Sequence, residues 1–62
     1  QALDSRILIE QAKGMLAERA GLSLRDAFTA MRSYARGKGC GLASVANGVL
    51  DGTLQTSALL AR

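Results

Sequence analysis

The sequence predicts an all-α fold, a compact three-helix bundle with a long first helix. Its 62 residues suffice for one small domain with a thin core, because 48% are apolar and eleven of those are alanine. Proline is absent, and the abundant Ala, Leu, Arg and Gln favour helix. Apolar residues recur at helical spacing in three segments separated by glycines. These observations exclude a multidomain enzyme.

The first segment, from about Ala2 to Ala20, predicts a helix roughly 28 Å long that ends at Gly21. Its main apolar face consists of Leu8, Ile9, Ala12, Met15, Leu16 and Ala20. A second row, offset from this face, follows a weakening heptad spacing through Leu3, Ile7, Glu10, Gly14 and Ala17. This seam row indicates either the tail of a dimeric coiled coil that begins before Gln1, or an exposed Leu and Ile that a surface tolerates.

The second helix is expected from about Leu24 to Arg36. Ser23 is its predicted N-cap, with Asp26 three residues later in a weak form of the capping box. Its predicted buried stripe consists of Leu24, Ala27, Phe28, Met31 and Ala35, with Tyr34 at the margin.

The third helix follows a short loop bracketed by Gly37, Gly39 and Gly41. Its apolar face consists of Leu42, Val45, Ala46, Val49 and Leu50, and the turn signal Asp51-Gly52 ends it. We assign residues 1–52 to the domain and 53–62 to a C-terminal tail, which forms either a fourth short helix or a frayed end.

Composition also limits the chemistry. The chain has one cysteine and no histidine, so it has neither an internal disulfide nor the usual ligands of a zinc site. Without a histidine base, a paired nucleophile or a large pocket, we expect no enzyme activity, cofactor, metal or small-molecule substrate. Cys40 is interpreted as a bystander thiol in a turn. A core this thin predicts a partner subunit. The start at Gln1 instead of methionine suggests a segment of a longer protein.

No apolar run approaches the roughly 18 residues of a membrane span, and no signal-peptide pattern is present. The sequence therefore predicts a soluble, cytoplasmic protein without a membrane partner.

The net charge of +3 is unevenly distributed. Residues 1–38 contain seven basic and four acidic groups, whereas residues 39–62 contain one of each. Arg25, Arg32 and Arg36 are seven and four residues apart, and therefore share one face of the second helix. Arg6 and Lys13 are likewise seven residues apart on the first helix. Such sorting favours a polyanionic partner, although a solvated surface with accidental clustering is the alternative.

RNA suits this charge pattern better than DNA. A DNA-reading helix-turn-helix needs donors on the outer face of its last helix, but that face here carries Ala43, Ser44, Asn47, Gly48 and Asp51. Arginines on the second helix suit RNA loops, whose unpaired bases stack on guanidinium or aromatic planes. Tyr34 is the predicted aromatic platform, whereas Phe28 is expected in the core.

Gly14 lies within an otherwise strong helix, where it costs about 1 kcal/mol relative to alanine. We therefore expect a neighbouring helix or a bound backbone to approach closely beside Lys13; the alternative is that the glycine is merely tolerated.

Four strings form one combined pattern: SRILIEQAKGMLAERAGLS (5–23), DAF (26–28), MRSYAR (31–36) and LASVA (42–46). This pattern closely resembles the ANTAR domain, the RNA-binding module of bacterial transcription antitermination regulators. The resemblance covers about residues 2–50, and the combined pattern is far more specific than the AKG triplet alone. Asn47-Gly48 departs from the family pattern, in which better helix formers are usual at this point.

The resemblance implies a three-helix unit that usually follows a sensor domain and a coiled-coil linker. ANTAR domains act as dimers that bind paired stem-loops with hexanucleotide loops in nascent mRNA. This binding favours the antiterminator over the terminator hairpin. The homodimer would form through the first helix and an upstream segment.

The resemblance also implies site residues. Ala12, Ala27 and Ala35 match the family's small packing positions. The basic contact positions match Lys13, Arg19, Arg32 and Arg36, and weaker candidates are Arg6 and Tyr34. Two other functions remain open: a helical dimerisation or protein-interaction module whose basic face is only solvated, and, less favoured, a DNA-binding helix-turn-helix.

Overall fold

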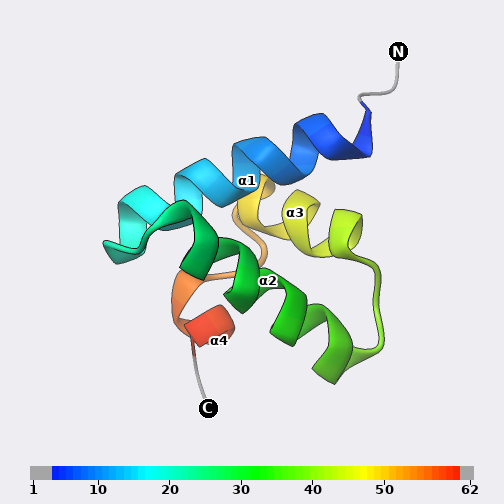
Figure 1. The fold of residues 1–62 in the computed structure, drawn as a ribbon. Helices are drawn as coiled ribbons and strands as arrows, with labels where there is room; N and C mark the ends of the chain where they lie inside the picture. Colours follow the sequence, from blue (N-terminus) through cyan, green and yellow to red (C-terminus); the bar gives the residue numbers. More distant parts are fainter. Residues whose placement is uncertain (1–3, 61–62) are drawn as a thin grey trace.

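A computed structural model describes residues 4–60 as a bundle of helices (Figure 1). The helices are α1 (Ser5–Ala20), α2 (Leu24–Lys38), α3 (Leu42–Asp51) and the short α4 (Thr56–Leu60). The all-α prediction is confirmed. No helix in this part of the chain is both long and apolar enough to cross a membrane.

Local sequence signals set both ends of α1. The carboxylate of Asp4 caps the start by accepting a hydrogen bond from the Arg6 backbone N–H at 2.8 Å. Gly21 ends the helix in the left-handed conformation, with φ 68°, and its N–H donates to the Ala17 carbonyl. The predicted start at about Ala2 is wrong, because the backbone of Asp4 is extended, with ψ 135°, and α1 begins at Ser5. Leu3 of the seam row lies outside the described residues.

The second helix extends further than the sequence predicted. Its N-cap is Ser23, as predicted, and the Ser23 Oγ accepts a hydrogen bond from the Asp26 N–H at 3.0 Å. The predicted end at Arg36 is wrong, because α2 continues through Gly37 to Lys38. The chain turns only at Gly39, which takes the left-handed conformation that glycine adopts most readily, with φ 68°.

The tail, whose structure the sequence left open, forms α4. Asp51 organises the turn that precedes it, because its Oδ1 accepts hydrogen bonds from the Thr53 hydroxyl at 2.7 Å and the Thr53 N–H at 2.9 Å. The chain then returns to the bundle, where Leu59 is buried, with an exposed fraction of only 6%. Leu59 thus closes the core from α4.

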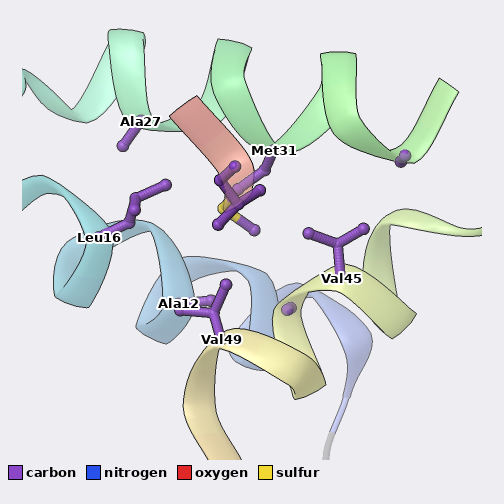
Figure 2. Close-up of a cluster of buried hydrophobic side chains, with 9 residues drawn as sticks. Ala12, Leu16, Ala27, Met31, Val45 and Val49 are labelled. Atoms are coloured by element: carbon purple, nitrogen blue, oxygen red, sulfur yellow. The ribbon is translucent and has the colours of Figure 1, made fainter. Parts of the chain in front are cut away.

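The core lies between α1, α2 and α3, and small residues allow the helices to approach one another. Leu16, Met31 and Val45 point into the common space between the three helices (Figure 2) and are its largest fully buried side chains. The complete buried set is Ala12, Leu16, Ala27, Met31, Ala35, Val45, Ala46, Val49 and Leu59. Two predicted members of the stripe of α2, Leu24 and Phe28, are not in this set. Leu24 is 56% exposed, because it is the first residue of α2 and lies at the turn, outside the helix contacts.

The neighbouring helix predicted to approach Gly14 is not found there, whereas a close approach occurs at Gly48. A Cβ at Gly14 would meet no atom within 4 Å, so no helix of residues 4–60 explains that glycine, and a bound backbone beside Lys13 stays a prediction. At Gly48, a Cβ would lie 2.9 Å from the Leu54 Cβ. The Leu54 N–H donates to the Gly48 carbonyl at 2.9 Å, which holds the returning chain against α3. Gly48 therefore faces the tail instead of solvent.

This contact predicts that Gly48→Ala destabilises the fold by about 1–3 kcal/mol, because the new Cβ would force the Leu54 backbone away from α3. Circular dichroism during thermal unfolding should show a midpoint several degrees below that of the parent. An unchanged midpoint would show that the tail does not pack against α3 in this way.

Gly14→Ala should have the opposite effect. The position has open space and ordinary helical geometry, so alanine should stabilise the fold by about 0.5–1 kcal/mol. The same unfolding measurement tests this, and a lower midpoint would reveal a steric contact at Gly14.

Candidate nucleic-acid interface

The outer side of α2 carries three arginines in a row. Arg25, Arg32 and Arg36 are all exposed, and their spacing of seven and four residues places them on one face of this helix. Both ion pairs recorded within residues 4–60 belong to α1 and its cap, and neither includes one of these arginines. The arginine row, as we call Arg25, Arg32 and Arg36, therefore keeps its positive charge available for a partner.

Phe28 borders the arginine row, and its predicted place in the core is wrong. The residue is half-buried, and it is not among the partly buried hydrophobic side chains of residues 4–60 that pack against the core. The Arg32 Cζ lies 5.9 Å from the centre of the ring, and the Lys13 Nζ lies 5.4 Å from it. Both distances are within the range of cation–π attraction.

The position of Phe28 on α2 explains this arrangement. Arg32 follows it by four residues, about one turn along the helix. Ala27, the preceding residue, is fully buried, so Phe28 lies at the edge of the buried stripe. The spacing of Phe28 and Arg32 is a usable sequence signal for this contact, but an aromatic residue at helical spacing also fits the core.

Lys13 brings α1 into the same cluster. Its side chain is only 19% exposed, and its ammonium group lies 3.0 Å from Glu10 Oε1 and donates a hydrogen bond to Oε2 at 3.1 Å. Lys13 is thus held in place by a carboxylate while it lies beside the Phe28 ring. We call Lys13, Phe28 and Arg32 the aromatic–cation cluster.

The predicted platform, Tyr34, lies elsewhere on α2. It is half-buried and packs against the core, and Lys38 lies 5.6 Å from its ring centre. Six residues separate Phe28 from Tyr34, which places them about 120° apart around the helix. Tyr34 and the aromatic–cation cluster are therefore on different flanks of α2.

The two remaining predicted residues lie on α1. Arg6 pairs with Asp4 at 3.6 Å, and its side chain is 88% exposed. Arg19 is exposed in the last turn of α1, where its positive charge interacts favourably with the negative end of the helix dipole. Within the described part of the chain, no ion pair or cation–π contact joins either residue to Phe28.

The outer face of α3 has a different character. Ser44, Asn47 and Asp51 are exposed there, and α3 contains no basic residue. Hydrogen bonds from the Thr53 hydroxyl and then from its backbone N–H lower the pKa of Asp51, which favours the charged carboxylate. This face therefore carries a negative charge and no cation. Residues 4–60 also contain no group of three or more His, Cys, Asp or Glu side chains that could hold a metal ion.

Comparison with known proteins identifies the family. The family model described as the ANTAR domain matches residues 1–50, which include the aromatic–cation cluster and the arginine row. No curated protein and no solved structure gives a significant match. Because the family match covers most of the 62 residues, this chain belongs to the ANTAR family, the RNA-binding domains of bacterial transcription antitermination regulators.

Proposed function

We propose that this chain binds paired stem-loops with hexanucleotide loops in nascent mRNA as a dimer, and so prevents formation of a terminator hairpin. The observation that carries the proposal is the arginine row, which is exposed and takes part in no ion pair recorded within residues 4–60. In a member of the ANTAR family, such a surface is suited to the phosphates of RNA.

The proposed contacts extend over two helices. Arg32 and Arg36 on α2 would bind phosphate through their guanidinium groups, and Lys13 and Arg19 would contribute from α1. Lys13 donates to Glu10, but its ammonium group has three protons and can serve a phosphate as well. Arg6 and Tyr34 are weaker candidates, because Arg6 is paired with Asp4 and Tyr34 packs against the core.

RNA is favoured over the DNA major groove by the charge on α3. A helix-turn-helix would insert its last long helix into the groove, yet the exposed residues of α3 include Asp51 and no cation. The cationic surface lies on α2, and single-stranded loops can reach it without a groove-shaped docking geometry.

The dimer would form along the seam row of α1. Ile7 is 47% exposed, and Gly14 has open space above its Cα. Both belong to the row that heptad spacing marks on α1, which a second copy of this helix could cover. Two linked domains would hold two stem-loops at once, and the second binding event would profit from a high effective concentration.

The RNA contact predicts a loss of affinity in Arg32→Ala of at least about tenfold, since a charge-assisted hydrogen bond is removed. The RNA affinity of Arg32→Ala should also depend less steeply on salt concentration than that of the parent. Four phosphate contacts give a slope of log affinity against log salt of about −2.8, and each lost contact reduces it by about 0.7. Fluorescence anisotropy with a tandem hexaloop RNA over a salt series measures both.

Lys38→Ala is the matched control, because it removes the same charge from α2 beside Tyr34 and away from the arginine row. It should bind RNA nearly as the parent does. Equal binding by Arg32→Ala and the parent, with helicity unchanged, would contradict the assigned face.

The dimer predicts that Leu3→Ala/Ile7→Ala shifts the sedimentation coefficient toward the monomer, because the apolar part of the seam row is lost. Arg36→Ala changes a residue of α2 and leaves the seam row of α1 intact, so this variant should sediment as the parent does. A parent chain that stays monomeric at high concentration would contradict dimerisation through α1 of this segment.

A further inference from the structure

We propose that the ring of Phe28 is a stacking platform for one unpaired base of the bound RNA, with Arg32 as the side chain that yields its place over the ring. This inference rests on the proposed RNA-binding function and assigns a ligand subsite within it. It depends on the half-buried position of Phe28 at the edge of the buried stripe, its separation from the core, and the two cations beside its ring.

The two cations differ in how firmly they are held. The Lys13 side chain is 19% exposed and paired with Glu10, so its ammonium group is held over the ring from α1. Arg32 is exposed, and the ring is its recorded contact among the described residues. An incoming ligand can therefore displace the guanidinium of Arg32 at little cost, whereas Lys13 remains in place.

The chemistry of the site favours a nucleobase. The face of an aromatic ring attracts a cation, and a planar base stacks on it more strongly than an exposed cation does. A displaced Arg32 can then contact the phosphate of the same nucleotide or stack on the other face of the base, since a guanidinium is planar. Every base has such a face, so the subsite provides affinity with little sequence selection.

Phe28 is better suited to this role than Tyr34, the other aromatic residue of α2. Tyr34 packs against the core, so its ring already has a structural role. Its neighbouring cation is Lys38, whose compact ammonium group provides no planar surface. Phe28 has both an adjacent planar cation and a position beside the arginine row.

The test uses the 62-residue chain and a hexaloop stem-loop RNA in which 2-aminopurine replaces each loop base in turn. With the parent, fluorescence should change at one loop position when the base stacks on the protein. Phe28→Leu keeps the apolar bulk but removes the aromatic face. It should abolish that change and lower affinity about tenfold, which corresponds to about 1.4 kcal/mol.

Two further readouts separate stacking from other effects. The salt slope of Phe28→Leu should equal that of the parent, because no phosphate contact is lost. Phe28→Trp should retain the affinity and the fluorescence change, since it restores an aromatic face. Tyr34→Leu is the control for loss of an aromatic side chain on α2, and it should keep the fluorescence change.

Several results would overturn the inference. If Phe28→Leu bound as the parent does while Arg32→Ala bound weakly, the RNA-binding function would stand and the platform would be wrong. The same holds if Phe28→Leu and Phe28→Trp both lost helicity, since Phe28 would then be structural. A parent chain that bound no stem-loop RNA would refute the proposed function, and the platform with it.

Discussion

The packing of α1 against α2 is the constraint on which the candidate site depends. Ala12 and Ala27 are fully buried on these two helices, where small side chains allow close packing. Lys13 and Phe28 are the residues that directly follow them in the chain, and the Lys13 Nζ lies 5.4 Å from the centre of the Phe28 ring. The core therefore determines not only the fold but also which cation lies beside the aromatic ring.

The division of charge between the helices follows from the same packing. The buried stripe of α2, which includes Met31 and Ala35, turns the arginine row outward. Two acidic groups at α1 form local ion pairs, Asp4 with Arg6 and Glu10 with Lys13. On α3, Asp51 accepts two hydrogen bonds from Thr53 and faces solvent. The outer side of α2 is thus cationic, whereas the outer face of α3, which a helix-turn-helix would place in the DNA groove, carries no cation.

The sequence predicted the helices and caps well, because helical periodicity and the Ser23 and Gly21 signals are local. It did not predict where Phe28 lies, since an aromatic residue at the margin of a stripe fits either the core or the surface. Gly14 and Gly48 look alike in sequence, and only the return of the tail shows that Gly48 needs to be small. Such contacts between distant segments leave no periodic signal.

The RNA-binding surface is tested most directly by an NMR titration of the isotope-labelled chain with a tandem hexaloop RNA at near-physiological salt. The largest shift changes of backbone amides should lie in α2 around Phe28, Arg32 and Arg36 and in α1 around Lys13, with little change at Ser44 of α3. Changes centred on α3, or equal changes with a scrambled RNA, would contradict it.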